Sequence, residues 1–385
     1  MKAILQAFDF HPQTRIVFGP GSINRLGELT RELGGRRVLV VTDPGLEQAG
    51  HPQKAVRSLE EAGLSVTVFD QVEENPTTFH VEAGLRVARQ ANIDFLVAVG
   101  GGSAMDVAKG INFLFTNGGK MADYWGNGKA TKPMLPSIGV PTTAGTGSEA
   151  QSYALIADPK THLKMACGDR KAAFRVAVLD PEVTLTQPPR VTADTGMDAI
   201  SHALEAYVTT RRNPLAQALA REAWRLLAGH FERVLHDPSD LDARAAMQLG
   251  AHLAGMAIEN SMLGATHALA NPITAHYGIT HGQAIGLMLP HVIRFNSQAV
   301  GDLYADLLRE VHQDNGRYGD AGKLLAERVE GLARAAGLPA RLSDLGINAA
   351  ILPVLAEEAS QQWTGRFNPR PVSAAELLTL YQTAY

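Results

Sequence analysis

The chain has 385 residues, about two and a half times the length of a typical ~150-residue domain, so two domains are expected. Hydrophobic residues make up 45% of the chain and charged residues 19%, which excludes a disordered chain, a collagen-like rod and a coiled coil. The 35 basic and 39 acidic residues leave a net charge of −4 without a run of like charges, so nucleic acid is not indicated as a partner.

The N-terminal segment and the single cysteine bear on the location of the protein. Asp9 and His11 come too soon for the apolar region of a signal peptide. No stretch approaches the roughly 18 to 20 apolar residues of a membrane helix. Cys167 has no partner for an internal disulfide or a CxxC motif, which fits a reducing compartment. We therefore expect a cytoplasmic protein without a membrane partner.

Strands and helices are expected to alternate in the first half of the chain. The predicted strands are residues 36–43, 64–70, 93–99 and 134–140, and the predicted helices are residues 52–62, 77–91 and 104–115. Asp43-Pro44-Gly45 is expected to form a turn after the first strand. This order predicts a parallel sheet that is covered on both faces, with ligands bound outside the carboxyl ends of its strands.

The pattern changes after Pro188-Pro189, where helix-forming residues with a period of about 3.6 become dominant. One stripe is expected to be buried and consists of Leu241, Ala245, Leu249, Leu253 and Met256. No alternating strand pattern is evident in this half. The fold class is therefore an α/β N-terminal domain (residues 1–188), a Rossmann-like variant of a parallel sheet, followed by an all-α C-terminal domain (residues 189–385).

Two glycine-containing loops follow predicted strands. The first, Gly100-Gly101-Gly102-Ser103, leads into a helix whose bare N–H groups can bind a pyrophosphate, although a tight turn would explain the glycines equally well. The second spans residues 141–149 and carries four hydroxyl groups, which is more than a simple turn needs. The two loops together indicate a dinucleotide site.

Asp43 follows the first predicted strand and has two interpretations. Its carboxylate can accept both ribose hydroxyls of NAD and would repel the 2′-phosphate of NADP. Alternatively, it only initiates the turn before Pro44-Gly45. The acid precedes the main glycine loop and no GxGxxG follows the first strand, so the fold departs from the usual Rossmann fingerprint.

A carboxylate and several histidines in the second half have spacings that suit metal ligands. Asp198 and His202 are four residues apart and share one helix face, with Glu205 on the same face as a candidate to support a ligand from behind. His267, His276 and His281 follow within 15 residues in an apolar setting. A surface ion pair and hydrogen-bonded core histidines are the alternatives. A set of one Asp and three His suits Fe(II) or Zn(II) and disfavours Mg²⁺ or Ca²⁺.

The motifs resemble those of the iron-dependent (group III) alcohol dehydrogenases, which include lactaldehyde reductases and 1,3-propanediol dehydrogenases. The resemblance runs nearly end to end. It covers VTD at 41–43, NPT at 75–77, GGGSxxDxxK at 100–109, TTxGTGSE at 142–149, DAxxHALE at 198–205, the two later histidine blocks and NPR at 368–370. It implies the architecture of this family and of the related dehydroquinate synthases, with a dinucleotide-binding first domain and a metal-binding catalytic second domain.

The resemblance also implies roles for individual residues. The implied metal ligands are Asp198, His202, His267 and His281. The implied NAD contacts are Asp43, Asn75, Gly101, Gly102, Ser103, Asp106, Thr142, Thr143, Thr146, Lys164 and Leu179. Leu179, Ile258 and Trp363 fall where the family lines its substrate pocket. Family members are commonly dimers or larger assemblies, so a homodimer or higher homo-oligomer is implied.

The chain departs from the family at one position. Many members carry a second histidine four residues after the third ligand, where it is thought to relay protons or touch substrate. Asn271 occupies that position here, and its side chain cannot exchange a proton near neutral pH. His276 is the candidate substitute. Asn271 and His276 are therefore the two candidates for a catalytic role.

The expected function is a metal-dependent NAD(H) alcohol dehydrogenase that interconverts a small primary alcohol or diol and its aldehyde. Fe(II) follows from the resemblance, whereas the ligand set would bind Zn(II) at least as tightly. A cyclase of the dehydroquinate-synthase type is the alternative enzyme, but it needs many Lys, Arg and Asn side chains, and Ala, Gly, Leu and Ile surround His267 and His281. A protein that only binds NAD or stores metal would not explain why both sets of residues occur together.

Overall fold

The computed structural model describes residues 7–161, 163–312 and 318–385. The chain divides into two compact units. Of the described residues, 11–143, 147–161 and 163–187 form an α/β unit, whereas 188–312 and 318–385 form a helical unit together with residues 7–10 and 144–146. The loop after the fourth predicted strand therefore contributes residues 144–146 to the helical unit.

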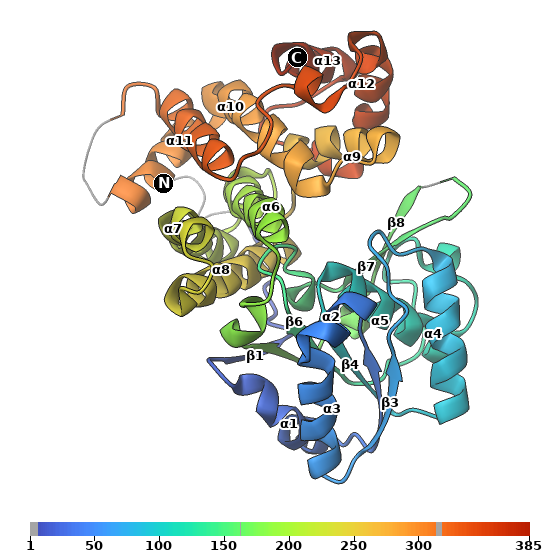
Figure 1. Cartoon of the computed structure of the whole chain (residues 1–385). Coiled ribbons are helices and arrows are strands. Elements are labelled where there is room, and N and C mark those ends of the chain that lie inside the picture. The colour runs from blue at the N-terminus through green and yellow to red at the C-terminus, as the bar shows by residue number, and fades with distance from the viewer. Residues whose placement is uncertain (1–6, 162, 313–317) are drawn as a thin grey trace. The chain divides into compact units, whose positions relative to one another are not determined.

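A six-stranded sheet, all of whose strand pairs are parallel, forms the centre of the α/β unit (Figure 1). In spatial order its strands are β1 (Arg15–Phe18), β9 (Val176–Leu179), β6 (Ser137–Pro141), β4 (Phe95–Gly100), β2 (Arg37–Val41) and β3 (Ser65–Phe69). The chain moves from β2 to β3 on one side and then places β4 on the other side of β2. The direction of winding therefore reverses between β2 and β4, and such a reversal opens a ligand crevice at the carboxyl ends of the two strands.

Helices cover both faces of this sheet, as the alternating pattern predicted. Val38 and Val40 of β2 pack in one core with α1 (Leu26–Glu32) and α3 (His51–Glu61). Leu39 and Val41 point the other way and pack with α4 (Thr78–Ala91) and α5 (Gly102–Asn117). Successive side chains of a strand face opposite sides, so apolar residues at every position bury both faces of the sheet.

The turn predicted at Asp43-Pro44-Gly45 is instead the start of a short helix, α2 (Pro44–Ala49). Asp43 is its N-cap and accepts a hydrogen bond from the Leu46 N–H, while Pro44 occupies the first helical position. Both residue types favour exactly such a helix start, but six residues are too few to show a helical period. Five short strands were not predicted either, namely β1, β5 (Gly126–Asn127), β7 (Tyr153–Ala157), β8 (Lys164–Gly168) and β9. β7 and β8 form a small second sheet with β5.

The helical unit contains helices and no assigned strand among its described residues, as predicted. Its helices are α6 (Pro189–Val208), α7 (Pro214–His236), α8 (Leu241–Glu259), α9 (Ala265–Tyr277), α10 (His281–His312), α11 (Ala321–Ala335), α12 (Leu352–Ser360) and α13 (Ala374–Thr383). α6 packs against α7, α8 and α10. The predicted fold class, a parallel α/β part followed by a helical part, is confirmed.

The stripe predicted to be buried on α8 is wrong. Its five members are only partly buried, whereas the buried face of the helix carries Ala243, Met247, Ala251, Ala254 and Ile258. This face is rich in small residues because α7 and α6 approach it closely. A Cβ at Gly250 would come within 2.8 Å of the Leu227 side chain on α7.

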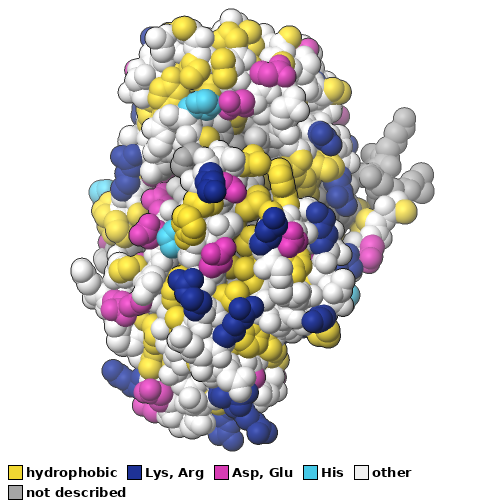
Figure 2. Space-filling view, turned by 90° about the vertical axis from the view of Figure 1, so that its right-hand side faces the viewer, with side chains coloured by type: hydrophobic (Ala, Val, Ile, Leu, Met, Phe, Trp, Pro, Cys, Tyr) yellow, Lys and Arg dark blue, Asp and Glu magenta, His cyan; other side chains and the backbone are white. Residues whose placement is uncertain are grey.

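Two further observations concern possible partners. Within the described ranges, no helix combines the length and the apolar character that crossing a membrane requires. Figure 2 shows acidic and basic side chains interspersed on the face that it presents. On this face there is no broad area of a single charge, which agrees with the absence of like-charge runs in the sequence.

Candidate active site

Asp43 and the first glycine loop lie side by side at the carboxyl ends of β2 and β4. Oδ2 of Asp43 is 3.4 Å from the position that a Cβ at Gly100 would occupy. Burial raises the pKa of the Asp43 carboxyl, although N–H groups of α2 stabilise its charge. Asp43 therefore caps a helix, which is close to the second interpretation, in which it only initiates a turn. Its contact with a ribose stays a prediction.

The two predicted loops meet within the α/β unit. The Thr142 N–H donates to the Gly100 carbonyl at 3.0 Å, and a Cβ at Gly101 would lie 3.4 Å from Thr143. Gly102 and Ser103 form the first turn of α5, after the N-cap Gly101. The N–H groups of a first helical turn lack intrahelical acceptors, so they are available to an anion. Thr146 belongs to the helical unit.

Asp106 and Lys109 of the GGGSxxDxxK motif form a buried network with Ser148 of the second loop. The Ser148 hydroxyl donates to Asp106 Oδ1 at 2.7 Å, and Lys109 Nζ donates to the Ser148 carbonyl at 2.7 Å. Lys109 Nζ also donates to the Tyr153 carbonyl at 2.7 Å and lies 3.8 Å from Asp106 Oδ1. Burial raises the pKa of Asp106, and the Lys109 charge opposes that rise. The network links α5 to the second loop, a role that the sequence did not indicate.

The remaining predicted cofactor contacts lie in varied surroundings. Asn75 is exposed and has a left-handed backbone conformation with a φ of 52°. Lys164 is exposed at the start of β8, whereas Leu179 is fully buried at the end of β9. Their contacts with NAD stay predictions.

Three of the four predicted metal ligands, the histidines, converge on a carboxylate oxygen of the fourth, Asp198. Oδ1 of Asp198 lies 3.3 Å from Nε2 of His202, 3.5 Å from Nε2 of His267 and 3.7 Å from Nε2 of His281. The Nε2 atoms of His202 and His267 are 3.1 Å apart. Asp198 and His202 lie on adjacent turns of α6, His267 lies in α9 and His281 begins α10.

The residues of this cluster fit a divalent cation. Oδ1 of Asp198 is buried and has no hydrogen-bond partner in the described part of the chain. A buried carboxylate oxygen without a donor is costly, and a cation would compensate it. Ligand atoms of Asp198, His267 and His281 lie within 4.8 Å of one another. One carboxylate with imidazoles is a donor set that suits Fe²⁺ or Zn²⁺.

Glu205 orients His267 from behind. Its Oε2 lies 2.6 Å from Nδ1 of His267, and its Oε1 accepts the Thr266 N–H at 2.7 Å. Burial disfavours a charge on His267, but Glu205 and Asp198 outweigh it and raise the pKa of the imidazole to about 9. A carboxylate behind a histidine fixes which ring nitrogen faces a metal, so Glu205 is placed to keep Nε2 of His267 turned toward Asp198.

The NPR motif holds the start of α9, a role that its residues alone did not indicate. Oδ1 of Asn368 accepts the Ala265 N–H at 3.3 Å and the Asn296 side-chain amide at 3.0 Å. Arg370 donates to the Phe295 carbonyl at 3.0 Å, with its guanidinium 3.9 Å from the centre of the Phe295 ring. The motif thus connects α9, two residues before His267, to α10.

Neither candidate for a catalytic role is part of the His–Asp cluster. Asn271 donates to the Gln362 side chain at 2.9 Å. His276 pairs with Glu358 of α12 at 2.8 Å and is partly exposed. Nine residues are about two and a half helical turns, so His276 lies on the opposite face of α9 from His267. The structure therefore does not support His276 as a substitute for the missing histidine.

The two predicted pocket residues differ in exposure. Ile258 is buried near the end of α8, in the core of the helical unit. Trp363 is exposed at the start of a 3-10 helix (Trp363–Phe367) and packs edge-on against Phe367. Their contact with substrate stays a prediction.

Comparison with known proteins places this geometry in a family. Residues 12–181 match the iron-containing alcohol dehydrogenases, and residues 192–385 match the C-terminal part of the Fe-containing alcohol dehydrogenase family. The 1,3-propanediol dehydrogenase of Citrobacter freundii is 36% identical over 382 residues, which cover 98% of this chain and 99% of that protein.

Solved structures agree with the sequence matches. The crystal structure of a 1,3-propanediol oxidoreductase has a TM-score of 0.96 at 35% identity and covers 99% of this chain and 100% of its own. The sulfoacetaldehyde reductase of Bifidobacterium kashiwanohense, solved in complex with NAD⁺, has a TM-score of 0.89 at 28% identity. The match covers 98% of this chain and 99% of that protein. The chain therefore belongs to the iron-containing alcohol dehydrogenase family of oxidoreductases that act on CH–OH groups, as its motifs predicted.

Proposed function

We propose that this enzyme interconverts a small primary alcohol or diol and its aldehyde, with NAD(H) as the redox cofactor and Fe(II) as the metal. The observation that carries the proposal is the convergence of three histidine nitrogens on Oδ1 of Asp198, a buried oxygen that accepts no hydrogen bond in the described part of the chain. Asp198, His202, His267 and His281 would hold the cation, and Zn(II) would also suit this donor set. The bound cation would supply Lewis acidity toward an alcohol or carbonyl oxygen.

The chain's own residues would bind and orient the other reactants. The first turn of α5 and the hydroxyls of Thr142 and Thr143 would hold the pyrophosphate of NAD, and Asp43 would accept its ribose hydroxyls. Asn271 cannot move a proton near neutral pH, and His276 is paired with Glu358. We therefore expect the alcohol proton to leave through water on the side of His281, the most exposed of the four histidine and aspartate ligands. A cytoplasmic location and assembly into homodimers or larger oligomers stay predictions.

The test of this function uses protein that is purified without oxygen. Its metal content would be measured, and a panel of short alcohols and diols would be offered with NAD⁺ or NADP⁺ while the absorbance of the reduced cofactor is followed. We expect about one Fe(II) or Zn(II) per chain and NAD⁺-dependent oxidation of at least one small alcohol. Metal-loaded protein that reduces no cofactor with any alcohol, or that works without a divalent metal, would contradict the proposal.

Asp43 is expected to set the preference for NAD over NADP. Asparagine at this position keeps an oxygen that can cap α2 but removes the negative charge. Because a like charge near a phosphate costs several kcal/mol, Asp43→Asn should lower the ratio of kcat/KM for NAD⁺ to that for NADP⁺ by about tenfold or more. Asp94 immediately precedes β4 and so lies at the amino ends of the strands, whereas Asp43 lies at their carboxyl ends. Asp94→Asn is therefore the matched control. An unchanged ratio in Asp43→Asn would show that Asp43 only caps the helix.

A further inference from the structure

His281 is held differently from the other candidate ligands. Asp198 and His202 lie in the middle of α6, and His267 is backed by Glu205. His281 is the first residue of α10, and its side chain is 32% exposed, whereas the other three are 5% to 8% exposed. The preceding helix, α9, ends at Tyr277 and is capped by Gly278, which has a left-handed backbone with a φ of 62°. A ligand at the end of such a connection needs an anchor if its ring is to stay in place.

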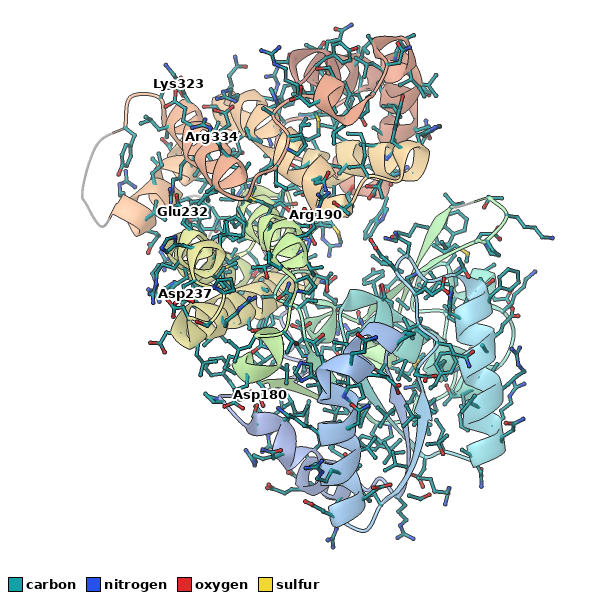
Figure 3. All side chains as sticks on the ribbon, in the orientation of Figure 1. Asp180, Arg190, Glu232, Asp237, Lys323 and Arg334 are labelled. Atoms are coloured by element: carbon teal, nitrogen blue, oxygen red, sulfur yellow. The ribbon has the colours of Figure 1, made fainter. Side chains whose placement is uncertain are left out.

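Asp194 supplies a side-chain connection to this segment. It lies one helical turn before Asp198 on α6, and its side chain is buried. Its Oδ2 accepts the Thr280 hydroxyl at 2.8 Å and receives Nε of Arg190 at 3.3 Å. Arg190, labelled in Figure 3, belongs to the first turn of α6. Asp194 therefore links the helix of two ligands to the residue directly before His281.

The backbone on the other side of His281 rests on the same residue. A Cβ at Gly282 would lie only 2.0 Å from the Asp194 carbonyl oxygen, so this position has no room for a side chain. The Thr280 carbonyl accepts the N–H groups of Gln283 and Ala284 at 3.1 and 3.3 Å, which fixes the first turn of α10. Both neighbours of His281 along the chain thus lie against Asp194.

We propose that Asp194 is a positioning residue that holds His281 toward Asp198 by anchoring Thr280. Asp194 acts through the Thr280 hydroxyl, and Arg190 balances the charge of its carboxylate. The proposal rests on the proposed function in one respect, namely that the four-residue cluster binds a divalent metal. Residues that orient metal ligands typically contribute 10- to 100-fold to metal affinity.

The test titrates metal-free protein with Zn²⁺ against a chromophoric chelator and compares dissociation constants. We expect Asp194→Ala to weaken Zn²⁺ binding by about 10- to 100-fold and Thr280→Val to weaken it similarly. Asp194→Asn and Thr280→Ser keep the hydrogen bond, so their affinities should stay within about threefold of the wild type. The double variant Asp194→Ala, Thr280→Val should bind Zn²⁺ no more weakly than whichever single variant binds it more weakly, because both substitutions remove the same interaction.

The control is Asp240→Ala in the same unit. Like Asp194, Asp240 pairs with an arginine, since it contacts Arg233 at 2.6 Å, and it accepts the Ala243 N–H at 2.9 Å as the N-cap of α8. Its loss should leave Zn²⁺ affinity unchanged. Equal weakening in Asp240→Ala would assign the effect to general destabilisation and overturn the proposal. If Asp194→Ala does not fold, the comparison of Thr280→Val with Thr280→Ser decides.

Failure of the positioning role differs from failure of the metal site. If wild-type protein does not bind Zn²⁺, the proposed function and the role of Asp194 both fall. If the wild type binds Zn²⁺, Asp198→Ala does not, and Asp194→Ala binds as tightly as the wild type, then only the positioning role is wrong.

Discussion

Asp198→Ala is expected to abolish metal retention and turnover while NAD binding is unchanged. The Asp198 oxygen is the atom on which all three histidines converge, and it is the only carboxylate of the predicted ligand set. Metal catalysis of this kind contributes several kcal/mol of charge stabilisation, so kcat should fall by at least about a thousandfold. Metal content of the purified variant, NAD⁺ titration and steady-state kinetics measure the three effects.

A second aspartate of the helical unit provides the control. Asp302 lies on α10 and is exposed, so Asp302→Ala should keep both metal and turnover. NAD⁺ affinity of Asp198→Ala reports whether the α/β unit is intact. A variant that keeps one metal ion per chain and wild-type kcat would show that Asp198 is not a ligand.

The sequence could predict those parts of the site that depend on local spacing. Asp198 and His202 are four residues apart, and the helical period alone places them on one face. His267 follows 65 residues after His202, with α7 and α8 between them, and no local period carries that distance. The clustering of three histidines within 15 residues suggested ligands there, but only the resemblance to a family selected His267 and His281, rather than His276, for the cluster. The same limit applies to Asp194 and Thr280, which are 86 residues apart and were not singled out.

The errors have local physical causes. His276 is close to His267 along the chain, but nine residues along a helix put it on the opposite face, where Glu358 pairs with it. On α8, the larger leucines predicted the wrong stripe because close contact with α7 selects small residues for the buried face. Hydrophobicity ranks a leucine above an alanine, whereas helix packing distance favours the alanine. The buried stripe therefore could not be read from hydrophobicity alone.

Lys109 bears on the stability of the α/β unit, and its replacement by methionine is expected to be strongly destabilising. Its Nζ donates to the carbonyls of Ser148 and Tyr153 and lies near the buried carboxylate of Asp106, and the Lys109 side chain itself is only 1% exposed. Removing one partner of a buried ion pair leaves an uncompensated charge and typically costs about 3–5 kcal/mol in the free energy of unfolding. Urea unfolding, followed by circular dichroism, measures this cost.

Two further variants separate charge from packing. Asp106→Asn in the Lys109→Met background removes the uncompensated charge but keeps an acceptor for the Ser148 hydroxyl, so it should restore part of the lost stability. Arg15→Met removes a partner from an ion pair of the same unit, in which Arg15 and Glu32 are 2.8 Å apart and both exposed. That change should cost at most about 1 kcal/mol. If the double variant is as unstable as Lys109→Met alone, the lost stability comes from packing and not from the uncompensated charge.

The cost of Lys109→Met should also grow with pH. Burial raises the pKa of Asp106 in the folded protein, and the Lys109 charge holds this rise back. A group whose folded pKa exceeds its unfolded pKa binds more protons when folded, so its contribution to stability is lost as pH rises through the folded value. Without Lys109 the folded pKa of Asp106 rises further, and keeping this carboxyl protonated becomes less favourable at higher pH. The difference in Tm between wild type and variant should therefore be larger at pH 8 than at pH 5, whereas a constant difference would mean that Asp106 does not carry the uncompensated charge.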